Sequence, residues 1–223
     1  MIGFQDNRLP TNFYTRSDVV QIARELLGKT LVTCFEGQRT AGIIVETEAY
    51  CGERDRACHA HLGKFTKRTE VMYREGGTAY IYLCYGMHHL FNVVTNVEGK
   101  ADAVLIRAIQ PTEGIEIMLQ RRKLAQLSPK LTAGPGIVSV ALGISKMHNG
   151  IHLAHSPYIW IENAEPLAAA QIVTTTRIGV DYAQEDALLP WRFVIKDNPW
   201  CSRFTPPKLL KRALVSVCKL EQK

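Results

Sequence analysis

The sequence predicts an α+β fold built around a largely antiparallel β-sheet with flanking helices. Its 223 residues are 46% hydrophobic and 22% charged, an ordinary globular composition that rules out disorder as the main state. No internal repeat, low-complexity tract or Ser/Gly-rich linker divides the chain, so we expect a single domain over residues 1–223. The segments that look like strands are joined mostly by turns too short for parallel crossovers, which predicts antiparallel pairing.

The first part of the chain predicts a helix followed by a β-hairpin. Ser17-Asp18 is typical of a helix start, and Gly28 is typical of a helix end. Strands over residues 30–34 and 40–50 then flank a turn at 36–37. The apolar residues of the helix share one face: Val19, Ile22, Ala23, Leu26 and Leu27.

The rest of the chain predicts strands, turns and two short helices. Residues 53–75 are expected to form a polar loop, and an aromatic strand over 78–85 ends at Gly86. One helix is expected to open at Pro111-Thr112-Glu113, and a second to follow Gly134-Pro135-Gly136 and end near Gly143. Further strands are expected over residues 90–95, 103–109, 158–162 and 191–196.

The charge balance favours polyanionic partners. Lys and Arg number 27 against 21 for Asp and Glu, so the net charge is +6. This surplus suits nucleic acid, although a soluble basic protein without a charged partner would also fit. The N-terminal residues lack the basic start and apolar core of a signal peptide, and no apolar run reaches the ~20 residues of a membrane helix. We therefore expect a protein that is neither secreted nor bound to a membrane.

The cysteines predict neither a structural zinc site nor disulfides. No two of them are spaced as Cys-x-x-Cys, so we expect reduced, mostly buried thiols. The segment Cys58-His59-Ala60-His61 is the one local cluster of metal-ligand types, and it has no second ligand pair at a usable spacing. No metal or other cofactor is expected. The six cysteines are Cys34, Cys51, Cys58, Cys84, Cys201 and Cys218.

Two acidic residues follow an apolar run in one predicted strand. Strand side chains alternate between faces, so Glu46, Glu48 and Tyr50 share one face, with the two carboxylates ~7 Å apart. One interpretation is a solvated outer face of the sheet. The other is a carboxylate that acts as a general base.

Arg107 interrupts a strand that is otherwise apolar on both faces, residues 103–109. A guanidinium buried there needs an anionic partner, and Glu48 or Glu46 is the obvious candidate. A structural salt bridge and a functional pair both fit this pattern.

The segment 80–86 is rich in tyrosine. Tyr80 and Tyr82 share a strand face, whereas Tyr85 has the opposite parity and lies beside a flexible Gly86. Aromatic strands usually belong to the core, but an aromatic residue at a hairpin tip can insert between DNA bases. In the next strand, Asn92 requires hydrogen-bond partners if it is buried.

Eight short motifs occur in an order that identifies a resemblance. Together they resemble the alkyladenine DNA glycosylase family, also called the methylpurine or 3-methyladenine DNA glycosylases, over about residues 14–203. The motifs are Val45-Glu46-Thr47-Glu48-Ala49-Tyr50, Tyr82-Leu83-Cys84-Tyr85-Gly86-Met87, Phe91-Asn92-Val93, Leu105-Ile106-Arg107-Ala108, Gly134-Pro135-Gly136, Arg177-Ile178-Gly179-Val180, Pro190-Trp191-Arg192-Phe193 and Pro199-Trp200-Cys201-Ser202-Arg203.

The resemblance implies a monofunctional DNA repair glycosylase with a curved sheet and a protruding β-hairpin. Such an enzyme flips alkylated or deaminated purines out of double-stranded DNA, hydrolyses the N-glycosidic bond and leaves an abasic site. It implies a monomer that needs no cofactor, in the cytoplasm and nucleoid of a bacterium or the nucleus of a eukaryote.

The resemblance also implies roles for the residues that match its motifs. Glu48 matches the carboxylate that activates water, and Arg107 matches the arginine that helps to hold that water. Tyr50, His59 and Tyr82 match the residues that sandwich and hydrogen-bond the flipped base.

Four further residues match positions that select the base or contact DNA. Asn92 matches the residue that obstructs the exocyclic amine of guanine, and Tyr85 matches the tyrosine that fills the gap left in the duplex. Met72 and Tyr80 match positions near the DNA-facing hairpin and are expected to contact DNA.

Three features depart from the family pattern. The loop Thr66-Lys67-Arg68-Thr69 lacks the usual Pro and Asn, Ile137 stands where many members carry Lys, and the basic tail 204–223 has no counterpart. A non-catalytic nucleic-acid-binding module of related fold remains the alternative function. Glu48 and Arg107 together discriminate against it, because a pure binding module needs no such pair beside a base-sized pocket.

Overall fold

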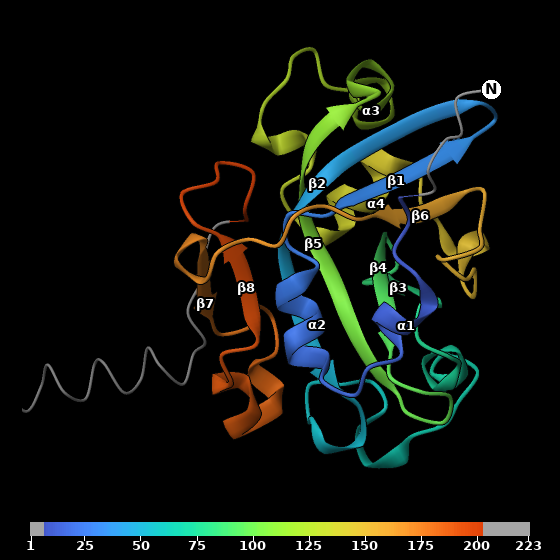
Figure 1. The fold of residues 1–223 in the computed structure, drawn as a ribbon, viewed down its shortest axis with the longest axis vertical. Coiled ribbons are helices and arrows are strands. Elements are labelled where there is room, and N and C mark those ends of the chain that lie inside the picture. The colour runs from blue at the N-terminus through green and yellow to red at the C-terminus, as the bar shows by residue number, and fades with distance from the viewer. Residues whose placement is uncertain (1–6, 203–223) are drawn as a thin grey trace, which may run out of the picture.

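Two long antiparallel strands, β2 (Gln38–Cys51) and β5 (Asp102–Glu113), cross the middle of the molecule (Figure 1). The structure is a computed structural model that describes residues 7–202, so the chain start, Arg203, Cys218 and the tail 204–223 lie outside the described residues. The sheet order is β3-β4-β5-β2-β1-β6, with β8 paired to both β2 and β7. The remaining strands are β1 (Thr30–Phe35), β3 (Ala79–Cys84), β4 (His88–Thr95), β6 (Ile159–Glu162), β7 (Ile172–Thr175) and β8 (Arg192–Ile195).

Every strand pairing within residues 7–202 is antiparallel, and the sheet curls into a half-barrel. This confirms the predicted α+β fold in a single domain. The α-helices of this part are α1 (Thr11–Tyr14), α2 (Val19–Glu25), α3 (Ile115–Arg122) and α4 (Pro135–Leu142). The 3₁₀ helices are η1 (Gly52–Arg54), η2 (His61–Gly63), η3 (Glu70–Tyr73), η4 (Pro129–Leu131), η5 (Lys146–His148), η6 (Ala169–Gln171) and η7 (Asp181–Leu188).

The predicted N-terminal helix and hairpin are both present. The Asp18 side chain caps α2 by accepting a hydrogen bond from the backbone N–H of Gln21. Glu36 and Gly37 both have positive φ, at 52° and 76°, and join β1 to β2. Two consecutive positive φ values suit the tight turn of a twisted antiparallel pair.

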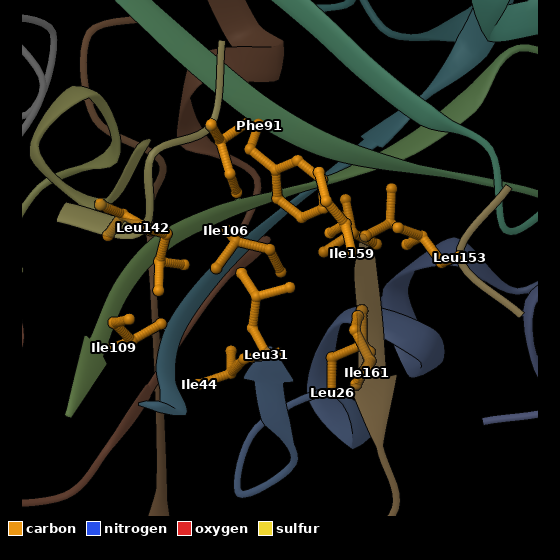
Figure 2. Packing of buried hydrophobic residues seen from close by; sticks show 14 of the residues in the cluster. Leu26, Leu31, Ile44, Phe91, Ile106, Ile109, Leu142, Leu153, Ile159 and Ile161 are labelled. Carbon is orange, nitrogen blue, oxygen red and sulfur yellow. The ribbon is translucent and has the colours of Figure 1, made fainter. Parts of the chain in front are cut away.

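The main hydrophobic core lies against one face of the sheet. Helix α2 packs on β2 and β5, whereas α4 packs on β4 and β5. Figure 2 shows apolar side chains from these layers meeting in one cluster. Fully or almost fully buried members are Leu26, Leu31, Ile44, Phe91, Ile106, Ile109, Leu142, Leu153, Ile159 and Ile161.

Three register shifts interrupt the pairing of β2 with β5, and two of them are adjacent β-bulges that precede Glu48 and Tyr50. The register passes from Ile44↔Ile109 to Glu46↔Ala108, and then to Thr47↔Ile106. Val45 and Arg107 are therefore the extra residues of the two bulges. A bulge changes which face the following side chains occupy. Beyond the bulges, Glu46, Glu48 and Tyr50 of β2 share the face opposite the main core.

Some element boundaries differ from the predictions. Residues Pro111–Glu113 belong to β5 and do not open a helix; α3 begins only after Gly114, which has a φ of 68°. A Cβ at Gly114 would lie 2.4 Å from the Arg39 carbonyl oxygen, so this close crossing requires glycine. Strand β7 was not predicted. Two of its four residues are exposed and two are half-buried, without the alternation that marks a strand.

Residues 53–75 are not simply a polar loop. They contain η2 and η3, and Val71 and Met72 are buried with Cys58, Ala60 and Tyr80 in a second, smaller apolar cluster. The prediction failed because sparse apolar residues in a charged segment show no helical or strand period.

The described cysteines are free thiols, as expected, but the expectation that most of them are buried was wrong. Only Cys58 is buried, while Cys34, Cys51, Cys84 and Cys201 are half-buried. Within residues 7–202, no helix is long and apolar enough to cross a membrane.

Candidate active site

A cavity of about 590 Å³ opens on the face of the sheet opposite the main core. Its wall combines β3, β4, β5, the start of α4 and the segments around residues 57–72 and 178–182. The sequence-predicted site residues converge here. Eight of the nine line the cavity: Tyr50, His59, Met72, Tyr80, Tyr82, Tyr85, Asn92 and Arg107.

The ninth residue, Glu48, lies directly behind this wall and is 0% exposed. Its Oε1 accepts a hydrogen bond from the backbone N–H of Ile178 at 2.7 Å. Its Oε2 accepts from Arg107 Nη1 at 3.1 Å and from the Tyr50 hydroxyl at 2.8 Å. All three donors line the cavity, so the Glu48 carboxylate is held at the cavity wall by groups that face its interior.

Arg107 joins both carboxylates of β2. Its Nε donates to Glu46 Oε1 at 2.8 Å, in addition to its bond to Glu48. The prediction of a carboxylate partner is confirmed for both candidates. Burial opposes the charge of Arg107, but Glu48 and then Glu46 more than offset this and raise the pKa of its guanidinium.

Glu46 belongs to a closed structural network. It is 0% exposed, so the interpretation of this strand face as a solvated outer surface is wrong. Arg192 Nε donates to its Oε1 at 2.8 Å, and Ser202 donates through both its backbone N–H and its hydroxyl. Burial alone would raise the pKa of Glu46, yet Arg107, Arg192 and these Ser202 bonds lower it below its usual value.

Arg192 and Ser202 were not predicted as partners of Glu46. Both lie in motifs that carry the family resemblance, and that was their only signal. They are more than 140 positions away from Glu46 in the sequence, and neither lines the cavity.

Aromatic rings form one side of the cavity. The Tyr82 ring lies 4.6 Å from the His59 ring, edge to face, and 5.4 Å from the Tyr80 ring. His59 Nδ1 lies 2.9 Å from the Tyr80 hydroxyl. Burial, and then Arg68 and Lys64, lower the pKa of His59 to about 4. Its imidazole is therefore neutral near pH 7.

Arg68 is a cavity residue that the sequence reasoning noted only as part of a departing loop. Its Nη2 donates to His59 Nε2 at 3.1 Å, and its Cζ lies 4.8 Å from the Tyr82 ring centroid. Because Nε2 accepts this bond, we infer that the His59 proton is on Nδ1 and points to the Tyr80 oxygen.

A second unpredicted pair supports Tyr50 from inside the protein. The buried Arg177 guanidinium lies 4.9 Å from the Tyr50 ring centroid and pairs with Asp55 through both of its terminal nitrogens. It also donates to the Ala49 carbonyl oxygen at 3.0 Å. Burial, followed by the charge of Glu48, raises the pKa of Tyr50, so its hydroxyl keeps its proton and donates to Glu48.

The other predicted residues take different positions around the cavity. Asn92 is 4% exposed and donates its amide to the carbonyl oxygens of Tyr80 and Leu90. It thus has the partners that a buried amide requires. Met72 and Tyr80 are each 2% exposed and lie in the inner wall, where they can meet a group inside the cavity but not the surface of a duplex.

Tyr85 lies at the turn between β3 and β4, next to Gly86. Its side chain is 88% exposed and its φ is 50°. The alternative that it belongs to the core is therefore wrong. The cavity mouth also includes Ile137 near the start of α4, where Gly136 allows close packing: a Cβ there would lie 2.8 Å from the His88 side chain.

Within residues 7–202, no group of three or more His, Cys, Asp and Glu side chains is placed to hold a metal ion. The side chains of the segment Cys58–His61 contact different parts of the protein. Cys58 Sγ contacts the Ala101 carbonyl oxygen, His59 lies in the cavity, and His61 Nδ1 lies 3.0 Å from the Glu53 carbonyl oxygen.

Comparison with known proteins agrees with the predicted resemblance. The sequence pattern of the methylpurine-DNA glycosylase family matches residues 12–199. The chain belongs to the methylpurine-DNA glycosylase family. All nine predicted site residues fall inside the matched range, and the basic tail falls outside it.

Relatives within this family are similar over most of their own length. A protein of Chlamydia felis is 51% identical over 189 residues, covering 84% of this chain and 95% of the relative. One of Alkaliphilus oremlandii is 45% identical over 88% of this chain and 99% of its own length. One of Methanocella arvoryzae is 46% identical over 89% of this chain and 97% of its own. Each is named "Putative 3-methyladenine DNA glycosylase".

Proposed function

We propose that this protein is a DNA repair glycosylase that flips a damaged purine out of duplex DNA and hydrolyses its N-glycosidic bond, with Glu48 activating the water. The observation that carries this proposal is a carboxylate held by Arg107, Tyr50 and the Ile178 N–H at the wall of an aromatic cavity. Family membership supports the same reaction class.

The cavity suits a flat, flipped base. Its volume of about 590 Å³ is within the range of small-ligand pockets, roughly 300–1,000 Å³. Tyr50, Tyr82 and His59 offer ring faces for stacking, which favours planar heterocycles. A base inside the duplex does not expose its glycosidic bond to a side chain, so extrusion at a few kcal/mol must precede chemistry. Damaged bases that pair poorly are extruded at lower cost.

The reaction needs one general base. The bond between C1′ and the purine nitrogen breaks, and its electron pair leaves with the purine, while the sugar acquires oxocarbenium character. Water adds its oxygen to C1′ and gives a proton to Glu48. A purine that is cationic in DNA leaves as the neutral base, whereas a neutral purine leaves as an anion that takes a proton from solvent. Glu48 then returns its proton to solvent, and the products are the free base and an abasic sugar. The shared bonds of Arg107 and Tyr50 to Oε2 orient the carboxylate for this step.

Two further features support base flipping without strand cleavage. Tyr85 is an exposed ring on a tight turn at the cavity mouth, suited to occupy the space that a flipped base leaves. Among the described residues that line the cavity there is no lysine to form a Schiff base with the sugar. We therefore propose a monofunctional enzyme that acts as a monomer in the compartment that holds DNA.

Base release from defined duplexes tests the proposal. Duplexes that each contain 3-methyladenine, hypoxanthine or 1,N6-ethenoadenine are incubated with the protein, and free base is measured by chromatography. We expect release of at least one base, with strand breaks appearing only after alkali. Glu48→Gln protein from the same preparation is the control for contaminating activity.

Two outcomes would contradict the proposal. Tight binding to lesion duplexes with no release of any base would favour a non-catalytic binding module. A protein–DNA adduct trapped by borohydride would show that the enzyme is not monofunctional.

A further inference from the structure

Asp55 and Arg177 form an ion pair behind the cavity wall that is closed to solvent. Each of the two residues is 1% exposed. Both terminal nitrogens of the guanidinium bond the carboxylate, with Nη2 donating to Oδ1 at 2.9 Å. A buried ion pair costs the desolvation of both charges and adds little to stability by itself. Its remaining contacts show what the pair holds in place.

The pair ties the end of β2 to the segment 177–186. Arg177 Nη1 donates to the Ala49 carbonyl oxygen at 3.0 Å, and Nη2 donates to the Asp186 carbonyl oxygen at 3.0 Å. Asp55 Oδ2 accepts a hydrogen bond from the backbone N–H of Cys51 at 3.2 Å. The backbone on both sides of the pair is therefore fixed by hydrogen bonds to these two side chains.

Two of the three donors to Glu48 lie on these segments. Ile178 follows Arg177 in the chain, and its N–H donates to Glu48 Oε1 at 2.7 Å. Tyr50 lies between the two residues of β2 that the pair bonds, and its hydroxyl donates to Glu48 Oε2 at 2.8 Å. Arg177 Cζ lies 4.9 Å from the centre of the Tyr50 ring. Tyr50 and Ile178 line the cavity and Arg177 does not, so Arg177 supports both donors from behind.

Trp191 completes the support of this pair. Its ring centre lies 5.1 Å from Arg177 Cζ, and its carbonyl oxygen accepts a hydrogen bond from the Ala49 N–H at 2.9 Å. Ala49 is thus held through its carbonyl oxygen by Arg177 and through its N–H by Trp191. A planar guanidinium suits this site, because it can contact rings while it bonds a carboxylate and two carbonyl oxygens.

We infer that Asp55 and Arg177 are positioning residues that set the orientation of the Glu48 carboxylate toward the substrate. The inference rests on the proposed glycosylase function. By fixing the Ile178 N–H on Oε1 and the Tyr50 hydroxyl on Oε2, the pair holds both oxygens of the general base. Misplacement of a catalytic group by about 1 Å can slow a reaction by about 10²-fold.

Three variants test the inference. Asp55→Asn keeps the shape of the side chain and removes the charge that holds Arg177. Trp191→Leu is the milder change, because it removes a half-buried ring and keeps the ion pair. Thr47→Val is the control for lost stability: the buried Thr47 hydroxyl donates to the Ala23 carbonyl oxygen at 2.8 Å, on the core side of β2.

Two measurements are made on each variant, at a temperature where circular dichroism shows it to be folded. One is single-turnover excision at saturating protein, together with the Kd for the same duplex, which carries hypoxanthine or 3-methyladenine, whichever the wild type releases faster. The other is hydrogen exchange of the backbone amides by NMR in the free protein, which does not depend on activity.

We expect Asp55→Asn to slow excision at saturation by about tenfold to a hundredfold, with the Kd within about threefold of the wild type. Trp191→Leu should slow it by about threefold to tenfold, and Thr47→Val should stay within about twofold. The Ile178 amide should exchange at least about tenfold faster in Asp55→Asn than in the wild type.

Four results would overturn the inference. They are equal slowing in Thr47→Val, a weaker Kd with an unchanged rate at saturation, an Ile178 amide as protected in Asp55→Asn as in the wild type, and, if Asp55→Asn does not fold, excision at the wild-type rate by Trp191→Leu. Release of no base by the wild type would instead defeat the proposed function, and the exchange of the Ile178 amide would still show whether the pair holds it.

Discussion

Glu46 and Glu48 are two residues apart on β2, and they look alike by most criteria. Both are 0% exposed, both lie on the face opposite the main core, and both pair with Arg107. They differ in their other partners. Glu46 is enclosed by Arg192 and Ser202, which do not line the cavity, whereas Glu48 is held by Tyr50 and Ile178, which do.

The difference shows that burial and charge pairing do not identify a catalytic carboxylate by themselves. A buried ion pair is weak evidence for function or stability, because structural networks contain such pairs too. What separates the two residues is the position of their donors. The hydrogen-bond donors of Glu48 line the cavity, so a group bound there lies next to this carboxylate. Glu46 instead accepts hydrogen bonds from Ser202 and so holds the segment around residue 202 against the sheet.

The largest expected effect is on chemistry and comes from Glu48→Gln. The amide keeps the shape of the side chain but cannot accept a proton, and a general base contributes about 10²–10⁴-fold. Single-turnover excision should fall by that factor while binding to lesion DNA is retained. A variant that loses less than about tenfold would remove Glu48 from its proposed role.

Glu46→Gln is the matching substitution at the other carboxylate, and we expect its main effect on the free energy of unfolding. Removing one charge leaves Arg107 and Arg192 buried beside a neutral amide, which typically costs about 3–5 kcal/mol. Urea unfolding should show this loss, and excision by the folded fraction should fall by less than about tenfold. If Glu46→Gln abolishes excision and leaves stability unchanged, the distinction between the two carboxylates is wrong.

The sequence predicted the residues around Glu48, whose partners line the cavity, better than the network around Glu46, whose partners Arg192 and Ser202 do not. Alternation placed Glu46, Glu48 and Tyr50 on one face, and an arginine in an apolar strand required a carboxylate partner. These are local patterns that period and burial rules can interpret.

The networks behind the cavity depend on contacts between segments that are distant in the sequence. Ser202 meets Glu46 across 156 positions, and Arg177 meets Asp55 across 122. No local pattern encodes such a pairing. Tertiary packing also decides three other features that the sequence did not predict. These are the bulges at Val45 and Arg107, the strand β7, and the start of α3 at Ile115, later than expected.

Tyr85→Ser removes the exposed ring at the mouth of the cavity. The ring is 88% exposed, so unfolding stability should change by no more than about 0.5 kcal/mol. The proposed role of the ring is to fill the space that the flipped base leaves. Its loss should therefore leave unstacking uncompensated and slow excision roughly tenfold to a hundredfold, most for lesions that pair well. Tyr158→Ser, another exposed tyrosine that does not line the cavity, is the control. A marked drop in melting temperature for Tyr85→Ser would show that the ring is packed in solution.

Asn92→Ala should change lesion choice more than rate. Its amide donates to two backbone carbonyl oxygens within the cavity wall, so removal frees space and leaves acceptors unpaired. Discrimination between guanine and hypoxanthine should weaken about tenfold, as expected for loss of one positioned polar group. Val94→Ala loosens the same strand without removing a polar group and should not alter the ratio. An unchanged ratio in Asn92→Ala would assign the selection to other residues.

The smallest expected effect is the contribution of His59 to the pH dependence of stability. His59 has a pKa of about 4 in the folded protein, below its ordinary 6.5, because of burial and then of Arg68 and Lys64. The unfolded chain therefore takes up this proton first, so the stability contributed by neutral His59 is complete above about pH 6.5 and is lost as the pH falls toward 4. Between pH 7 and pH 6, the difference in unfolding free energy between the wild type and His59→Asn should shrink by somewhat under about 1 kcal/mol. Urea unfolding at the two pH values measures it, and Arg68→Gln should reduce the slope only in part, because burial is the larger cause. If the difference in unfolding free energy between the wild type and His59→Asn does not change with pH, the pKa of His59 is the same in the folded and unfolded protein. The conclusion that burial and Arg68 lower this pKa would then be wrong.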